Sequence, residues 1–133
     1  WGALLEGVGR GPVGVPRVLG VLPLAVGINW YAAEFYSNAT HAGVRVQPLV
    51  ASPMRDDDEL DFATVLGRAK TCGWLVDAPS RGGVGWAMRH APRIRAELLE
   101  GRRPRFVEAA WWPLPDARAP ATGERLVLYR RIR

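Results

Sequence analysis

Short apolar runs alternate with helical patterns along this chain, and this alternation limits the fold more than any other feature of the sequence. The run over residues 18–22 is continuously apolar, as expected of a strand that is buried on both faces. Runs of this kind predict strands over 18–22, 44–51, 74–76, 106–112 and 125–132. Patterns with helical spacing lie between the first four runs and predict helices over 30–42, 58–72 and 86–99.

The predicted order is therefore β-α-β-α-β-α-β-β. Parallel strands need a crossover connection, and the helices supply one, so this order predicts an α/β fold. We expect a small Rossmann-like three-layer sandwich with a mainly parallel sheet of about five strands, the last strand being antiparallel. Residues 1–17 are dense in glycine and proline and should form a flexible leading segment. A single α/β domain over 18–133 should follow it.

The sequence also predicts the structural roles of four individual residues. Phe35 lies on the apolar face of the first helix, and together with Trp74 it is expected in the core. Asp58 should begin the second helix as its N-terminal cap. Pro92 should break the third helix, because proline lacks a backbone N–H and clashes with the preceding turn.

Composition excludes several classes of protein. The 133 residues are 48% hydrophobic, which suffices for one core, and the lone Cys72 excludes an internal disulfide. The most apolar stretch, 18–28, is shorter than the roughly 20 residues that a membrane span needs. The net charge of +5 comes with small basic clusters at 102–105 and 130–133. We interpret these small clusters as solvated surface. Proteins that bind nucleic acid usually interleave their cations with exposed aromatic side chains, so we do not expect a nucleic acid partner.

The acidic run at 56–59 is the strongest candidate for a metal site, through Asp56 and Asp58. Acidic residues are also favoured in the first turn of a helix by its dipole, and we prefer that explanation. The histidines, His41 and His90, stand far apart without partners at ligand spacing, and Cys72 has no evident base beside it. The sequence thus predicts no catalytic residue, no metal and no cofactor.

Ligand contacts are predicted at aromatic and basic positions instead. The tryptophans Trp30, Trp111 and Trp112 belong to a surplus of aromatic residues beyond what one small core hides, so some of them should contact a ligand or partner. Trp111 and Trp112 are adjacent on a strand and should point to opposite faces. Arg81 stands in a glycine-rich turn before a helix, a place suited to binding an anion.

Three segments resemble the soluble tail domains of bacterial polytopic glycosyltransferases that use a lipid carrier, the dolichyl-phosphate-mannose mannosyltransferase-like enzymes. Residues 29–36 read NWYAAEFY, 68–76 read RAKTCGWLV, and 125–130 read RLVLYR. The resemblance spans about residues 15–133. It implies a small α/β domain on the extracytoplasmic face of a bacterial membrane, following the last membrane helix of the enzyme. The family's catalytic acid lies in loops upstream of the tail, so no catalytic residue carries over.

We therefore expect a non-catalytic accessory domain of a larger membrane glycosyltransferase. Its partners would be the membrane-embedded remainder of that protein or a lipid-linked sugar. One alternative is a truncated Rossmann-like enzyme domain that binds a nucleotide or S-adenosylmethionine, although residues 23–28 supply only Gly27 where such a turn uses two or three glycines. Another alternative is a basic module that binds protein or RNA in a large assembly. The chain opens at Trp1 rather than methionine, which suggests that it belongs to a longer protein.

Overall fold

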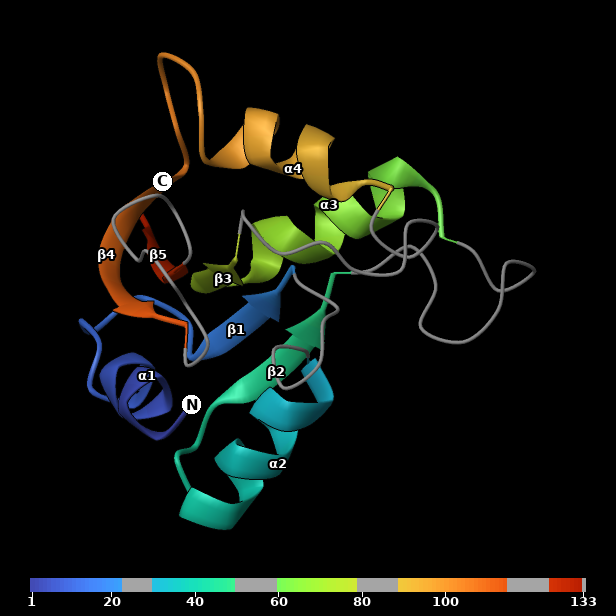
Figure 1. The fold of residues 1–133 in the computed structure, drawn as a ribbon. Helices are drawn as coiled ribbons and strands as arrows, with labels where there is room; N and C mark the ends of the chain where they lie inside the picture. Colours follow the sequence, from blue (N-terminus) through green and yellow to red (C-terminus); the bar gives the residue numbers. More distant parts are fainter. Residues whose placement is uncertain (23–29, 50–59, 79–88, 115–124, 133) are drawn as a thin grey trace.

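The computed structural model describes residues 1–22, 30–49, 60–78, 89–114 and 125–132. The eight elements predicted from the sequence occur in the predicted order, and one additional helix precedes them (Figure 1). The helices are α1 (Gly2–Gly9), α2 (Trp30–Thr40), α3 (Phe62–Thr71) and α4 (Ala91–Leu98). The strands are β1 (Val18–Val21), β2 (Arg45–Pro48), β3 (Trp74–Asp77), β4 (Phe106–Pro113) and β5 (Arg125–Arg131).

The five strands form one mixed sheet in the order β2-β1-β3-β5-β4. Strand β1 pairs in parallel with both β2 and β3. Strand β5 is antiparallel to both of its neighbours, β3 and β4. The expected reversal of the last strand is thus present, but parallel and antiparallel pairs are equally numerous, so the sheet is mixed rather than mainly parallel. The cause is the position of β5, which returns from β4 without a crossover helix and then lies beside β3.

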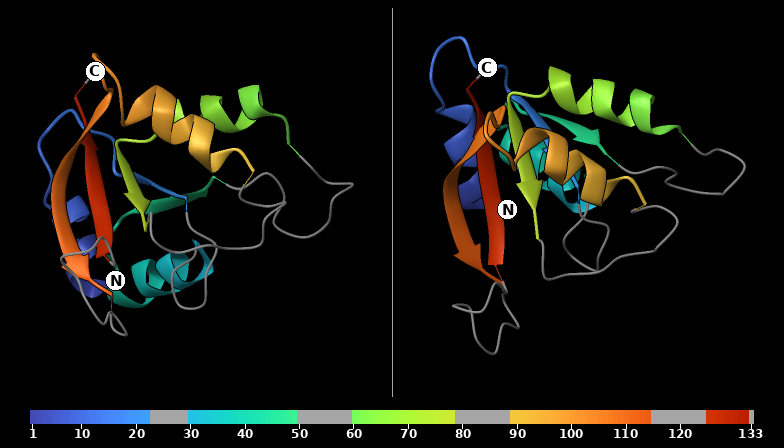
Figure 2. Two further views of the ribbon diagram at one scale, coloured as in Figure 1. Left: turned by 45° about the horizontal axis from the view of Figure 1, so that its top comes forward. Right: turned by 90° about the horizontal axis from the view of Figure 1, so that it is seen from above.

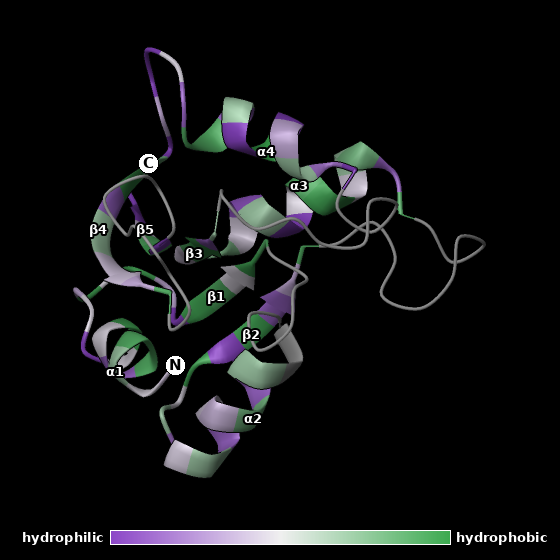
Figure 3. Cartoon of the chain, viewed as in Figure 1, coloured by the Kyte–Doolittle hydropathy of each residue, from purple (hydrophilic) through white to green (hydrophobic). Residues whose placement is uncertain are grey.

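Apolar side chains pack on both faces of the sheet. Because successive residues of a strand point to opposite faces, Leu19 and Val21 join one cluster, whereas Leu75 and Phe106 join the other. The first cluster is covered by α1 and α2, and the second is covered by α3 and α4 (Figure 1). In Figure 3 the hydrophobic colour is strong along β1, which lies between the two clusters.

Helix α1 occupies part of the segment for which the sequence predicted a flexible lead. Its side chains Leu4, Leu5 and Val8 are buried in the first cluster. These residues follow the i, i+1, i+4 spacing of a helix face, and the surrounding glycines conceal that pattern. Packing against the sheet therefore outweighs the poor helix propensity of glycine.

The buried face of α2 differs from the predicted one. Phe35 is 67% exposed, whereas Ala33 and Ser37 are buried. The Ser37 hydroxyl donates a hydrogen bond to the carbonyl oxygen of Val44 at 2.7 Å, which satisfies this polar group inside the fold. Small residues face the sheet because they allow the helix axis to approach it closely, and the aromatic ring is left on the outer face.

The starts of α3 and α4 also correct the sequence-based expectations. Asp61 caps α3, and its Oδ1 accepts a hydrogen bond from the backbone N–H of Thr64 at 2.7 Å. The predicted cap, Asp58, lies outside the described residues. Pro92 lies in the first turn of α4, which does not use the N–H that proline lacks, so the described helix begins at Ala91, and residues 86–88 of the predicted helix lie outside the described residues. None of the helices in the described ranges is both long enough and apolar enough to cross a membrane.

Candidate functional site

Polar and aromatic side chains gather on the sheet face that α3 and α4 partly cover. We call this group the β3–β5–β4 patch, and it consists of Asp77, Arg95, Glu108, Trp111, Arg125 and Tyr129. Strand register places its members together: Asp77 pairs with Val127, which pairs with Trp111. Residues paired across neighbouring strands share a face, so these side chains lie on the same side as Leu75.

A β-bulge makes this arrangement possible. In a regular strand, Glu108 and Trp111 would point to opposite faces because they stand three residues apart. The register of β4 against β5 shifts between Glu108 and Ala110, which inserts one extra residue. Glu108 therefore pairs with Tyr129 and Trp111 pairs with Val127, and both project from the same face of the sheet.

A buried ion pair anchors the patch. The Asp77 side chain is buried at the end of β3, and both of its oxygens accept hydrogen bonds from Arg95 on α4. The Arg95 Nε lies 2.6 Å from Oδ2, and Nη2 lies 2.8 Å from Oδ1. The hydrogen bond to Asp77 raises the pKa of Arg95, and burial opposes that shift. This bidentate geometry fixes both the guanidinium and the carboxylate in place.

Tyr129 stands at the electrostatic centre of the patch. Burial raises the pKa of its phenol, the carboxylates of Asp77 and Glu108 raise it further, and the guanidinium groups of Arg125 and Arg95 lower it. All four charged side chains thus act on this one hydroxyl. The phenol stays protonated at neutral pH and can both donate and accept a hydrogen bond.

Trp111 supplies an exposed aromatic surface at the edge of the patch. Its side chain is 47% exposed, and the guanidinium carbon of Arg125 lies 5.4 Å from its ring centroid. The Nη1 of Arg125 also lies 3.7 Å from Oε1 of Glu108. The arrangement presents a flat apolar ring beside a cation and a carboxylate, which suits a ligand that has both an apolar face and polar groups.

The structure places the predicted ligand-binding residues in different surroundings. Trp111 belongs to the patch, whereas Trp112 points to the opposite face and packs against the first core cluster. Trp30 begins α2, the helix that covers that opposite face. Arg81 and the weak metal candidates Asp56 and Asp58 lie outside the described residues.

Most of the patch was missed from the sequence. Asp77 could have indicated the site, because it is a carboxylate that ends an otherwise apolar strand and needs a partner if it is buried. No local pattern indicates that Arg95 would supply that partner. Likewise, the bulge that brings Glu108 to the same face as Trp111 leaves no recognisable mark in the sequence.

Two further reactive side chains of the described residues, Cys72 and His90, serve the fold. Burial raises the pKa of Cys72 to about 12, so its thiol stays protonated and unreactive at neutral pH. The Nε2 of His90 lies 2.8 Å from the carbonyl oxygen of Leu60, and its ring packs edge-on against Phe62. Across the ranges that the structure describes, no group of three or more His, Cys, Asp or Glu residues could hold a metal ion.

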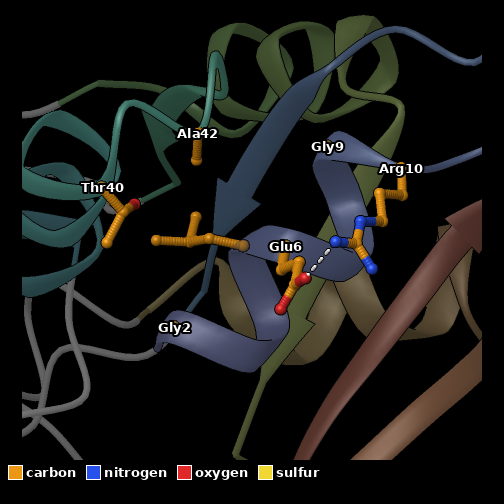
Figure 4. A pocket seen from close by; sticks show the side chains of 7 residues that line it. Gly2, Glu6, Gly9, Arg10, Thr40 and Ala42 are labelled. Atoms are coloured by element: carbon orange, nitrogen blue, oxygen red, sulfur yellow. Dashed lines mark ion pairs between the residues drawn. The ribbon is translucent and has the colours of Figure 1, made fainter.

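A separate groove of about 530 Å³ lies between α1 and the end of α2 (Figure 4). Its charged side chains are Glu6 of α1 and Arg10, which directly follows α1, and they form an exposed ion pair at 2.6 Å. Gly2, Leu5, Gly9, Thr40 and Ala42 complete the lining. This groove offers fewer polar groups than the patch, and its two charges already neutralise each other.

No protein-family model, no curated protein and no solved structure matches this chain. The described residues define an α/β protein with a five-stranded mixed sheet. Folds of this class carry many unrelated activities, so the function must be argued from the side chains of the site.

Proposed function

We propose that this chain is a non-catalytic accessory domain of a larger membrane glycosyltransferase, and that the β3–β5–β4 patch contacts the sugar of a lipid-linked carrier or acceptor. The observation that supports this function is the exposed ring of Trp111, which the charged pair Arg125 and Glu108 borders. A sugar ring has an apolar face of C–H groups and a rim of hydroxyls. An aromatic ring beside hydrogen-bonding charges complements both.

The rigidity of the patch also supports a binding role. Trp111, Arg125 and Tyr129 project from paired strands rather than from loops, so their relative positions are held by the sheet. The Asp77–Arg95 pair ties α4 to the same sheet. A preorganised surface loses little conformational entropy when a ligand binds.

The contacts within the patch favour binding over proton transfer. General acid–base catalysis needs a group that can exchange a proton near neutral pH. Both oxygens of Asp77 are engaged by Arg95, and the raised pKa of Tyr129 moves its phenol further from neutrality. Glu108 is paired with Arg125. The raised pKa therefore argues against a role for the Tyr129 phenol as a general base at neutral pH.

We also propose that the fold is a Rossmann-like three-layer sandwich, and this raises a second candidate function. Helices on both faces and the parallel order β2-β1-β3 support that assignment. In such folds ligands bind beyond the carboxyl ends of the strands, where the strand order reverses between β1 and β3. Asp77 ends β3 at that point, which favours a nucleotide or S-adenosylmethionine as the alternative ligand.

Calorimetric titration with methyl glycosides of hexoses, and with hexose 1-phosphates, tests the sugar-binding proposal. We expect saturable binding that Trp111→Ala weakens at least about tenfold, the loss of one good aromatic contact. Phe35→Ala is the matched control, because Phe35 is an exposed aromatic on α2 and should have no effect.

Absence of sugar binding, or an equal loss in both variants, would contradict the proposal. A thermal-shift assay with ATP, a nucleotide sugar and S-adenosylmethionine examines the second candidate. Saturable stabilisation by one of these ligands, insensitive to Trp111→Ala, would favour the nucleotide-binding alternative.

A further inference from the structure

One end of the sheet gathers residues from all five strands. Backbone hydrogen bonds run across this end from the Arg45 N–H to the Arg17 carbonyl at 3.0 Å and from the Gly73 N–H to the Val18 carbonyl at 3.1 Å. The row continues from the Arg131 N–H to the Gly73 carbonyl at 2.9 Å. It closes with the Ile132 N–H donating to the Arg105 carbonyl at 2.8 Å. Residues that are distant in sequence therefore lie side by side along this end of the sheet.

This end, which we call the basic edge, carries a concentration of cationic side chains. Helix α3 ends there, and the hydrophilic loop from α4 to β4 enters the sheet there (Figures 2 and 3). Its cationic members are Arg17, Arg45, Arg68, Lys70, Arg102, Arg103, Arg105, Arg130 and Arg131. Arg17, Arg45, Lys70, Arg102, Arg103 and Arg105 are exposed.

The charge of the basic edge is largely uncompensated. Within the described ranges, no ion pair involves any of its nine cationic residues. Around Arg102, Arg103 and Arg105, the described segment 89–114 contains three acidic residues, Glu97, Glu100 and Glu108, and the ion pair of Glu108 is with Arg125. The guanidinium of Arg131 donates to the backbone carbonyl of Lys70 at 3.2 Å, which draws these two residues together. The result is a broad positive field at one end of the molecule.

Two exposed aliphatic side chains accompany the cations. Ile132 follows Arg131 directly and is 47% exposed, and Val13 is fully exposed. Val13 lies in a turn three residues before Pro16. The backbone of Pro16 lies against Gly73, just before β3, since a methyl group on Gly73 would overlap the Pro16 carbonyl group. The basic edge thus combines positive charge with apolar groups that face water.

We propose that the basic edge docks on a membrane surface containing anionic phospholipid. Its arginines would lie over the phosphate groups, and Val13 and Ile132 would enter the interface between headgroups and acyl chains. Basic clusters are attracted to anionic leaflets, and flanking apolar side chains strengthen such attachment. This inference goes beyond the proposed sugar contact, since it concerns a different surface and a different ligand.

The arrangement fits a membrane better than a nucleic acid. Proteins that bind single strands place aromatic rings among their cations, so that bases stack on them. The exposed aromatic side chains of the described residues lie elsewhere: Phe35 and Tyr36 on α2, and Trp111 towards the other end of β4. The exposed groups next to the arginines are aliphatic, which favours a lipid interface.

Co-sedimentation of the purified chain with vesicles tests this proposal. We expect binding to vesicles of about 30% phosphatidylglycerol in phosphatidylcholine at about 0.1 M salt, and little binding to pure phosphatidylcholine. The pair Arg45→Gln and Arg105→Gln should lower the partition coefficient by about 10- to 30-fold. The control pair Arg89→Gln and Arg93→Gln removes the same charge just before and within the first turn of α4, where the Arg93 guanidinium also stacks on Phe62 at 3.7 Å, and should change the partition coefficient by about twofold or less.

Further variants separate this proposal from its competitors. Val13→Ser should weaken vesicle binding about tenfold, whereas binding to a nucleic acid would not depend on this side chain. Trp111→Ala should bind vesicles as the unaltered chain does, so this proposal and the sugar proposal can fail separately. Membrane docking would be overturned by equal binding to neutral and anionic vesicles, or by an equal effect of the control pair. It would also be overturned if a single-stranded oligonucleotide released the chain from vesicles and bound the Val13→Ser variant as tightly as the unaltered chain.

Discussion

The guanidinium of Arg95 holds both carboxylate oxygens of Asp77 at 2.6 and 2.8 Å, and this contact joins α4 to the end of β3. The two residues are not equally shielded, because the Arg95 side chain is 21% exposed and that of Asp77 only 1%. If the pair is broken, Arg95 can turn to water, whereas Asp77 would remain as an isolated buried charge.

This asymmetry predicts unequal costs for the two single substitutions. Arg95→Leu should lower the free energy of unfolding by about 3–5 kcal/mol, because it leaves the buried carboxylate without a partner. Asp77→Asn should cost less, about 1–3 kcal/mol, since the amide keeps one acceptor and the guanidinium can rehydrate. Urea denaturation of both variants measures the difference, and a larger loss for Asp77→Asn would refute this account.

Trp74 is predicted to be a critical aromatic residue of the core. The sequence indicated its burial, and the structure confirms that with an exposure of 4%. Trp74→Ala should cost about 3–5 kcal/mol. Among the described residues the indole N–H has no hydrogen-bond partner, so Trp74→Phe removes an unsatisfied donor and should cost less than about 2 kcal/mol. Equal losses in the two variants, measured by thermal unfolding, would show that the ring contributes little by packing.

Two glycine-to-alanine changes should have opposite effects. A methyl group on Gly73 would overlap the backbone carbonyl of Pro16, so Gly73→Ala should cost about 1–3 kcal/mol or more. Gly67 lies on α3 with no neighbouring atom within 4 Å of the new methyl, so Gly67→Ala should stabilise the protein by up to about 1 kcal/mol. The melting temperatures of the two variants, each compared with that of the unaltered protein, test this prediction. A lower melting temperature for Gly67→Ala would be evidence against the described α3.

Alkaline pH should destabilise the fold through Cys72. Burial raises the pKa of its thiol from 9.0 to about 12, so the folded state holds this proton more tightly than the unfolded state. The resulting stability is fully present below pH 9.0 and is lost as the pH rises towards about 12, by roughly 3–4 kcal/mol. Cys72→Ala should flatten this dependence. Rapid labelling of the native thiol at pH 8 would contradict the burial on which the prediction rests.

The order of elements could be predicted from the sequence because it depends on local periodicity. Continuous apolar runs mark β1 and β3, and the stripe of Val65 and Ala69 marks α3. Burial of one helix face was harder to predict. Phe35 stays outside although it is strongly apolar, since the contact of α2 with the sheet is made by Ala33 and Ser37.

The candidate site could be predicted only in part, because its geometry depends on pairing between distant segments. The sequence predicts Trp111 as a ligand contact. The structure places Trp111 in the patch, and its contact with a ligand is a proposal. The partners Asp77, Arg95 and Tyr129 come together only once β5 lies between β3 and β4. Neither that pairing nor the bulge near Glu108 leaves a periodic signal, so both had to come from the structure.

The interior position of β5 has a consequence for how the chain acquires its structure during synthesis. Strand β4 leaves the ribosome before β5, yet it pairs with no other strand of the described sheet. Until residues 125–131 emerge, β4 has no template, and the outer edge of β3 remains open. Termination of translation shortly before β5 should therefore release a chain in which β4 is unpaired on both sides and the outer edge of β3 is open, and such edges promote aggregation.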